Sequence, residues 1–485
     1  MKHAITLFFI VTASWLMFTI QTRAQHDLGS YQLGNVPQRI FQNPAFIPIQ
    51  KSYIGLPAIS GIQAAYANPF TYNDILSRDG NDSLNFNVEN FLSKMSKNHP
   101  LSLNSSVNIL SVGSMISKDR FFIDFSIRER VSQSVMLPEN LFNLLWYGNA
   151  APQLFGNHVN ILPVINAVAY DEYGFTFAGY AMKKRLTYGV TVKYLSGRFN
   201  INTRKSEFDF YTDSASYKIH LSSDLEVQTS GTDQIEHYFD KSISSLAFPG
   251  NPGFSIDLGL NYQINDKFTV NASLLDLGFI NWRQQTLTMV SHDPNAEFNF
   301  NGLTVKDFTE MFKDPAKFGK KVEDTLRKLI HIDSIYDVSY TSRLPLRFNV
   351  GGSYILNDHH RFNLLFNGIS WAKTFHPALS ASYNFTYKRF LELMVSYNVF
   401  NNQYTNIGGG VSISAGPIQL YLISDNIPGL IFYKSTNNYS FQFGLNIVLG
   451  KKSANEVVPE IKDSPELEKQ ENQQPPDSGK KLFKQ

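Results

Sequence analysis

The sequence predicts an all-β protein, a transmembrane antiparallel β-barrel of about fourteen strands with an N-terminal plug-like segment and helical extracellular loops. Three observations carry this prediction. Apolar and polar residues alternate along segments of roughly 9 to 12 residues, which is long enough for tilted strands to cross a bilayer. Short and long connections follow one another in turn. Aromatic residues make up 14% of the chain and charged residues only 17%.

The first 24 residues have the three parts of a secretory signal peptide. Lys2 and His3 precede an apolar run over residues 4–20, and the small residue Ala24 precedes Gln25. The alternative is an uncleaved membrane anchor, but the apolar run is at the short limit for a spanning helix. We therefore assign residues 1–24 to a signal peptide and expect an exported protein.

Composition excludes several classes of partner and site. A formal net charge of +2 gives no indication of a nucleic-acid partner, and the absence of cysteine excludes disulfides and thiolate metal sites. After residue 24 no stretch reaches the roughly 18 consecutive apolar residues of a spanning helix. Membrane insertion would therefore require a closed barrel, which pairs every backbone amide.

The rest of the chain divides into three parts. Residues 25–50 are rich in Gln, Asn and Pro without clean periodicity, and we expect a plug or hatch segment in the lumen. Residues 51–450 carry the alternating strands of the barrel. Residues 451–485 have the composition of a disordered tail, which we place in the periplasm, either solvated or bound to a partner.

The clearest alternation covers residues 254–264. One face of that segment is apolar and the other polar, and similar patterns recur at 187–194, 391–399 and 439–449. We expect strands near 51–66, 101–116, 120–132, 165–181, 186–199, 253–264, 267–282, 343–356, 361–373, 377–387, 390–400, 404–415, 417–424 and 439–449.

Connections after the even-numbered strands of this series are short and turn-like, whereas the long connections all follow odd-numbered strands. This segregation is typical of outer-membrane barrels, with short periplasmic turns and long extracellular loops. Helical spacing predicts helices within 303–332 and 88–97, either as a lid that captures a ligand or as loops packed on themselves. Residues 200–252 could extend strands beyond the membrane or form another hairpin.

Polar residues on the alternating strands point into the lumen if the apolar sets face lipid. They either line a pathway or form hydrogen bonds with a plug and with one another. The candidate lumen-lining residues are Asp257, Asn261, Gln263, Asn271, Arg347, Asn349, Asn384 and Glu392, and the plug candidates are Asn43 and Pro44.

Several short motifs resemble a family of uncharacterised outer-membrane proteins from Bacteroidetes. They are FQNPAF at 41–46, YIGLP at 53–57, IDLG at 256–259, LLDLGFINW at 274–282 and YLISDN at 421–426. The resemblance runs from about residue 28 to 450. It implies a barrel similar to the long-chain fatty-acid transporter FadL, with fourteen strands and an N-terminal hatch.

The Asn-Pro-Ala segment at 43–45 also resembles accessory membrane proteins of the type IX secretion and gliding machinery. One departure from the barrel pattern is that about 35 residues follow Leu449 and Gly450, so the assembly signal would be internal.

We find no catalytic constellation and expect neither an enzyme nor a cofactor. His331, His359 and His360 lack the carboxylate or cysteine neighbours of a metal site. A hydrolase would need a serine, a histidine and a polar residue that orients the histidine, and no serine stands out. The leading hypothesis is an outer-membrane barrel, surrounded by lipid, that binds or transports a small, hydrophobic molecule. The alternative is a structural or accessory subunit of a secretion or gliding machinery, with an envelope protein as partner.

Overall fold

The computed structural model describes residues 27–451, apart from gaps at 79–83, 96–99, 118–119, 150, 216–218, 233–249, 299–313, 315–332, 372–373, 389 and 401–402. Among the described residues, no helix is long and apolar enough to cross a bilayer.

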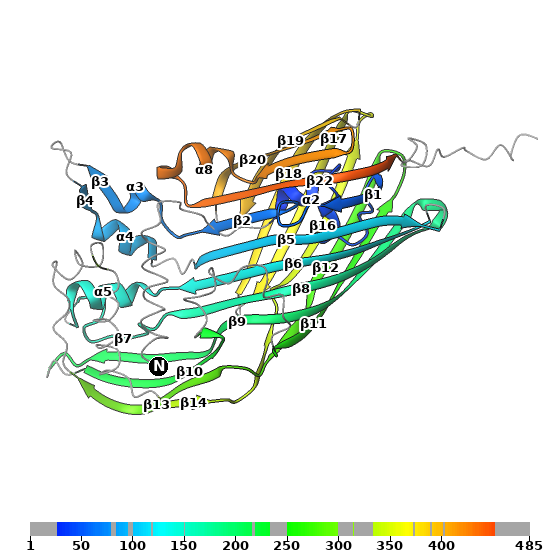
Figure 1. Cartoon of the computed structure of the whole chain (residues 1–485). Helices are drawn as coiled ribbons and strands as arrows, with labels where there is room; N and C mark the ends of the chain where they lie inside the picture. Colours follow the sequence, from blue (N-terminus) through cyan, green and yellow to red (C-terminus); the bar gives the residue numbers. More distant parts are fainter. Residues whose placement is uncertain are drawn as a thin grey trace, which may run out of the picture.

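Antiparallel strands form a closed barrel of fourteen strands (Figure 1). Each strand pairs with the next, and β1 closes the ring by pairing with β5 on one side and with β22 on the other. In order around the ring they are β1 (Gln50–Gly55) continued by β2 (Ile62–Ala67), β5 (Leu101–Ile116), β6 (Phe121–Met136), β8 (Val164–Ala181), β9 (Leu186–Thr212), β11 (Pro252–Gln263), β12 (Phe268–Trp282), β16 (Leu346–Ile355), β17 (His360–Trp371), β18 (Thr374–Tyr387), β19 (Leu391–Phe400), β20 (Gln403–Ala415), β21 (Ile418–Ser424) and β22 (Asn438–Lys451).

The predicted number of strands is confirmed, and two predicted boundaries are wrong. A single strand over 51–66 is interrupted between β1 and β2, because Pro57 has no N–H for a ladder and Ala58 has a φ of 61°. The strand expected to end at 199 continues to Thr212, because its outer half pairs with a strand that does not belong to the ring.

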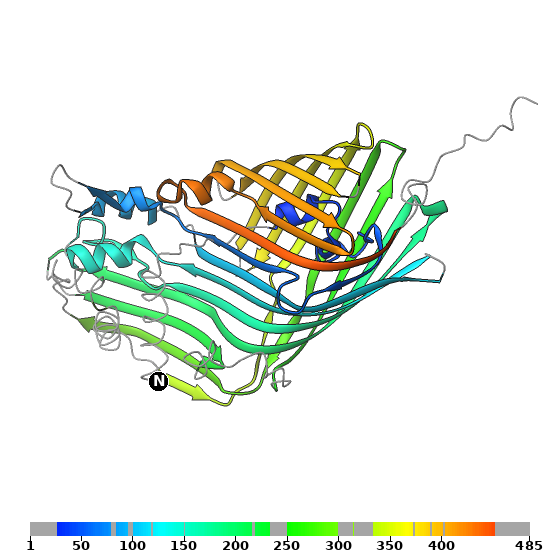
Figure 2. The same cartoon turned by 45° about the horizontal axis from the view of Figure 1, so that its top comes forward.

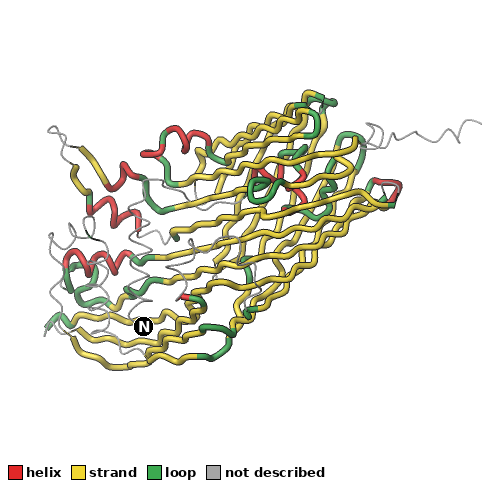
Figure 3. Tube along the Cα trace, viewed as in Figure 1, coloured by secondary structure: helices red, strands yellow, loops and turns green. Residues whose placement is uncertain are grey.

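Short and long connections lie at opposite ends of the barrel (Figure 3). Connections of three residues or fewer join β20 to β21 and η2 (Met182–Lys184) to β9 at one end of the barrel. We call this end the short-turn end. The long connections lie at the long-loop end, where the helices α3 (Tyr72–Ile75), α4 (Val88–Met95), α5 (Glu139–Tyr147) and α8 (Ile427–Ile431) also lie, together with η5 (Tyr433–Ser435) and the hairpin of β3 (Leu76–Arg78) and β4 (Leu84–Phe86).

The two faces of the barrel wall differ in composition as the alternation predicts. On β11, Phe254, Leu258 and Leu260 are exposed on the outside, whereas Ser255 and Asp257 are buried on the inside. The same contrast holds on β17 to β21. An exposed apolar outer face and a polar inner face are typical of a wall that meets lipid.

The sheet of the ring continues beyond the barrel at the long-loop end (Figure 2). The outer half of β9 pairs with β10 (Ile219–Ser230), β10 pairs with β13 (Thr286–Phe298), and β13 pairs with β14 (Asp333–Tyr336). An apolar cluster that includes Leu144 of α5 and Phe210 of β9 packs this extension. The short strands β7 (His158–Val159) and β15 (Tyr340–Arg343) pair with β9 and β12. The predicted helices within 303–332 and His331 lie outside the described residues.

Candidate functional site in the barrel lumen

Residues 27–49, which we call the lumen segment, lie against the inner wall of the barrel. The segment contains the short helices α2 (Leu28–Gln32) and η1 (Pro37–Phe41), and most of its side chains are buried. Figures 1 and 2 show α2 among the strands of the ring, toward the short-turn end. The lumen therefore contains folded chain at this level.

Two predicted lumen-lining residues hold the backbone of this segment. The Glu392 carboxylate accepts hydrogen bonds from the N–H of Gly34 at 2.9 Å and of Asn35 at 2.7 Å. Asn384 donates to the carbonyl of Gln32 at 3.0 Å and to Glu392 at 2.9 Å. Both Glu392 and Asn384 are fully buried, so the pair forms an anchor for the turn after α2.

Asn43 and Pro44 form a second anchor, on the opposite part of the wall. The Asn43 amide donates to the carbonyls of Leu260 at 3.3 Å and Ala272 at 3.2 Å, and its oxygen accepts from the N–H of Ala45 at 2.9 Å. Amide hydrogen bonds to strand carbonyls fix the turn directly to the barrel backbone. This explains why an asparagine stands at this point of the segment.

Asn271 and Asn349 also contact the lumen segment. The Tyr31 hydroxyl donates to Asn271 Oδ1 at 2.6 Å, and burial raises the pKa of Tyr31 to about 12, so this hydroxyl keeps its proton at neutral pH. The Asn349 amide donates to the carbonyl of Gln42 at 3.2 Å. Both predicted residues therefore bind chain rather than open space.

Asp257 and Arg347 belong to a buried ionic cluster around Asp276. The Asp276 carboxylate accepts from Arg130 at 2.8 Å, from Lys193 at 2.8 Å and from Arg347 at 2.9 Å. Two further carboxylates and one more arginine complete the cluster. Lys193 pairs with Asp257 at 2.6 Å and with Glu172 at 3.4 Å, and Glu172 also pairs with Arg128. We call these seven residues the ionic cluster.

The ionic cluster meets the lumen segment at its edge. Arg347 Nη1 lies 3.5 Å from Asp27 and 3.4 Å from the side-chain oxygen of Gln42. The guanidinium of Arg128 lies over the ring of Phe41, 4.1 Å from its centroid. The cluster covers the wall from β6 to β16 and leaves no member without a partner of opposite charge.

Asn261 and Gln263 lie elsewhere. Both are half-buried on β11 toward the short-turn end. No hydrogen bond joins either side chain to the described part of the lumen segment. Of the predicted lumen-lining residues, six are therefore brought to the segment or the ionic cluster and these two are not.

The wall opposite the ionic cluster carries apolar patches where it meets the segment. Leu28 and Tyr31 pack with Leu365 and Phe400, and Leu33 packs with Met394 and Ile423. Buried polar residues, such as Ser380 and Asn398, lie between these patches on the same inner face. The lumen thus has the ionic cluster on one side and apolar patches among polar residues on the other, with residues 27–49 in contact with both.

Period-two alternation does not predict that Asp276, the centre of the ionic cluster, faces inward. Because Asn271 and Ser273 face inward, strict alternation would place Asp276 toward lipid. However, β12 has a bulge at this point: Leu277 pairs with Ile256 and Leu274 with Leu258, so β12 contains one extra residue between these two pairs. A φ of 61° at Asp276 turns its side chain inward. An acidic residue at an expected lipid-facing position is the sequence feature that could have revealed the bulge.

No candidate metal centre is found in the part of the chain that the structure describes, where no group of three or more His, Asp or Glu side chains has suitable geometry. His359 lies in the turn before β17, and His360 is the first residue of that strand. Their Nδ1 atoms contact the carbonyl of Thr386 at 2.9 Å and the hydroxyl of Tyr383 at 2.6 Å.

A family model described as a family of unknown function, DUF5723, matches residues 44–425. The chain belongs to the DUF5723 family. No curated protein matches the sequence.

Among solved structures, the DUF5723 chain is similar to the toluene transporter TbuX of Ralstonia pickettii, with 10% identity, a TM-score of 0.38, and coverage of 85% of this chain and 94% of that chain. It is also similar to the monoaromatic hydrocarbon channel CymD, with 10% identity, a TM-score of 0.39 and coverage of 86% and 94%. A FadL homologue of Pseudomonas aeruginosa shows 10% identity, a TM-score of 0.38 and coverage of 88% and 99%.

Proposed function

We propose that the protein is an outer-membrane barrel that binds or transports a small hydrophobic molecule, and that residues 27–49 act as its plug. The observation that carries this proposal is the set of inward-facing apolar residues on β17 to β21, which lies opposite the ionic cluster and packs against the lumen segment. Porin-type channels keep their charged side chains in water. Here the charged side chains are buried and paired.

The wall of β17 to β21 provides the binding surface. Leu365, Met394 and Ile423 point into the lumen, and buried polar residues such as Ser380 and Asn384 lie between them. They are covered by apolar side chains of the segment, so a shift of the segment would expose separate apolar patches on β17, β19 and β21. A hydrophobic molecule could bind these patches without displacing the ionic cluster.

The proposal also includes an orientation of the barrel in the membrane and roles for the two terminal segments of the chain. We place the short-turn end in the periplasm and the long-loop end outside the cell, in keeping with the usual arrangement of outer-membrane barrels. Residues 1–24 would be removed on export, and residues 451–485 would form a periplasmic tail. The protein would act as a transporter or binding protein and not as an enzyme.

Hydrocarbon binding to purified protein in detergent tests this function. Toluene and laurate serve as probes, the first because similar barrels are named for toluene. We expect Met394→Glu, which places a charge on the apolar patch of β19, to lower binding at least tenfold. Ser396→Ala, two residues along the same inner face, is the matched control and should bind as wild type. Equal binding by both variants, or no binding by wild type, would overturn the proposal.

A second function is favoured by the extension of β9, β10 and β13. This extension has its own apolar cluster and stands beyond the ring at the long-loop end, where it would provide a folded surface for a protein partner. An accessory subunit of a secretion or gliding machinery would use such a surface. Co-purification of a defined envelope complex that is lost when residues 213–218 are replaced by a short glycine linker would support it.

A further inference from the structure

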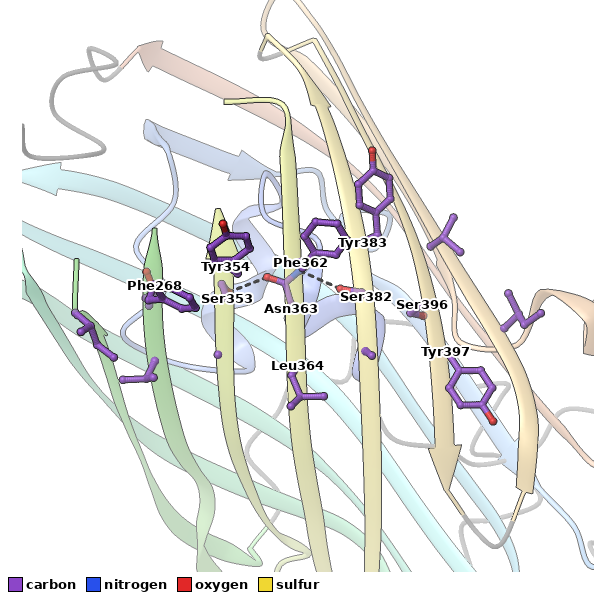
Figure 4. A pocket seen from close by; sticks show the side chains of 17 residues that line it. Phe268, Ser353, Tyr354, Phe362, Asn363, Leu364, Ser382, Tyr383, Ser396 and Tyr397 are labelled. Carbon is purple, nitrogen blue, oxygen red and sulfur yellow. Dashed lines mark hydrogen bonds between the residues drawn. The ribbon is translucent and has the colours of Figure 1, made fainter. Parts of the chain in front are cut away.

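A shallow apolar hollow of about 990 Å³ lies on the outer face of the barrel, across β12 and β16 to β20 (Figure 4). Its volume falls at the upper end of the range of small-molecule sites, roughly 300–1,000 Å³. The hollow is separate from the lumen site, because its apolar lining consists of outward-facing side chains such as Val270, Leu364 and Val395.

Two rows of outward-facing residues form the hollow. Strand register places the members of each row side by side on successive strands. The row nearer the short turns is Phe268, Tyr354, Phe362, Tyr383, Val395 and Gly409. The next row is Val270, Gly352, Leu364, Ala381, Tyr397 and Ile407.

Small residues make the floor of the hollow. Gly352 and Ala381 flank Leu364 in the second row, whereas the same two strands carry Tyr354 and Tyr383 in the first row. A Cβ at Gly352 would meet only the carbonyl of Thr269, at 3.6 Å. The space above Gly352 is therefore open, and the backbone geometry there does not require glycine.

Aromatic rings bound the hollow along the short turns. The rings of Phe268 and Tyr354 lie 4.8 Å apart between centroids, and those of Phe362 and Tyr383 lie 5.3 Å apart. At the far end of the first row, beyond the lining of the hollow, the Ile427 side chain of α8 covers Gly409 so closely that a Cβ there would lie 2.5 Å from it. The hollow thus has an aromatic rim on the side of the short turns.

Polar side chains that can bind a phosphate lie beside the aromatic rim. His360 continues the outward face toward the short-turn end, and its Nδ1 contacts the Tyr383 hydroxyl at 2.6 Å. His359 lies in the turn that precedes His360, and Lys388 lies in the next short turn with its Nζ over the ring of Tyr387. Lys267 and Lys388 are matched in number by Asp266 and Asp358 of the same turns, so these turns offer hydrogen-bonding groups and not an excess of charge.

We propose that this hollow is a binding site for one diacyl phospholipid, with its acyl chains over Gly352 and Ala381 and its phosphate beside His360 and Lys388. The hollow is continuous with the exposed apolar wall, so its occupant comes from the bilayer. With the short turns in the periplasm, as proposed above, the adjoining leaflet consists of phospholipid. The site does not depend on what passes through the lumen.

Native mass spectrometry of the full mature chain, extracted from phosphatidylglycerol vesicles into detergent, tests the acyl-chain site. We expect wild type to retain one phosphatidylglycerol molecule. The double variant Gly352→Leu with Ala381→Leu fills the floor and should retain at least tenfold less. Ala272→Leu, an exposed outward position on β12 outside the hollow, is the matched control and should retain as much as wild type.

A second comparison tests the phosphate contact. Wild type should prefer phosphatidylglycerol to diacylglycerol with the same acyl chains, and the double variant His360→Ala with Lys388→Ala should lose that preference. Heat-modifiable migration in gels verifies that each variant is folded. Equal retention by the floor variant and its control, or adducts of detergent only, would overturn the site.

The proposed lumen function and the proposed phospholipid site can be refuted independently of each other. The floor variant leaves every lumen residue in place, so toluene and laurate binding should be unchanged in it. Loss of phospholipid with hydrocarbon binding intact supports the outer site alone. Loss of both on the same substitutions would contradict the independence of the two sites.

Discussion

Gly259 lies directly opposite Gly189 in the register of β11 and β9, and the Asn43–Pro44 peptide crosses both glycines. A Cβ at Gly259 would lie 2.1 Å from Asn43 Oδ1, and one at Gly189 would lie 2.2 Å from the carbonyl oxygen of Pro44. The two glycines therefore form a notch in the inner wall that only a backbone without side chains can provide. The position of the lumen segment depends on two residues more than 140 positions away in the chain.

Gly259→Ala should release the lumen segment while the barrel stays folded. The methyl group displaces Asn43 from its two carbonyl partners, and each buried polar group left without a partner costs about 1–3 kcal/mol. Hydrogen exchange of the amides of residues 27–49 should rise, whereas exchange of the strand amides should not. Gly352→Ala, an outward glycine with open space, is the control, and equal exchange in both variants would contradict the notch.

Asp276→Asn should destabilise the whole barrel. The substitution removes the carboxylate shared by Arg130, Lys193 and Arg347, and breaking a buried ion pair costs about 3–5 kcal/mol because the remaining charges stay buried. Urea unfolding in detergent should show this loss. Asp224→Asn removes an exposed pair with Lys205 and should leave the midpoint unchanged. A midpoint equal to that of wild type for Asp276→Asn would show that the ionic cluster contributes little to stability.

Asp257 and Asp276 show how far the sequence could predict this site. Period-two alternation depends only on local backbone geometry, so it placed Asp257 inward, together with Asn384 and Glu392, and gave the correct number of strands. Alternation does not predict an inward-facing Asp276, because a bulge reverses which of the following residues face inward. Bulges depend on pairing with a neighbouring strand, which the local sequence does not give.

Local sequence patterns also do not predict contacts between residues that are distant in the chain. The sequence predicts a plug-like segment from composition alone, but the wall that receives Asn43 is built by Gly189 and Gly259, whose role follows only from strand register. The lipid-facing hollow has the same origin. Gly352 and Ala381 are ordinary small residues in the sequence and become neighbours of one cavity only when β16 and β18 flank β17.

Glu392→Gln should weaken the anchor that Glu392 and Asn384 form for the lumen segment. The carboxylate accepts the N–H groups of Gly34 and Asn35 on separate oxygens, and an amide offers only one acceptor. Hydrogen bonds to charged groups contribute about 1.5–3 kcal/mol, so exchange of these two amides should rise by about tenfold or more. Gln263→Ala, on the inner wall but away from the segment, should leave both amides protected. If both variants protect Gly34 and Asn35 equally, Glu392 does not hold the segment.

Leu260→Arg and Asn261→Arg test which face of the wall meets lipid. Leu260 is 52% exposed on the outer face of β11, and Asn261 is its inward neighbour. An arginine on the lipid side costs about 2–4 kcal/mol near the bilayer midplane and less toward either interface, because the charge must leave water. The Asn261 position opens toward the polar lumen, where a guanidinium keeps polar neighbours and the cost is smaller. Unfolding free energies measured in vesicles should therefore separate the two variants by at least 1 kcal/mol, an order-of-magnitude expectation from the same scale. Equal loss in both, or a greater loss for Asn261→Arg, would mean that the apolar face of β11 does not face lipid, and the lumen and the outer hollow would then exchange environments.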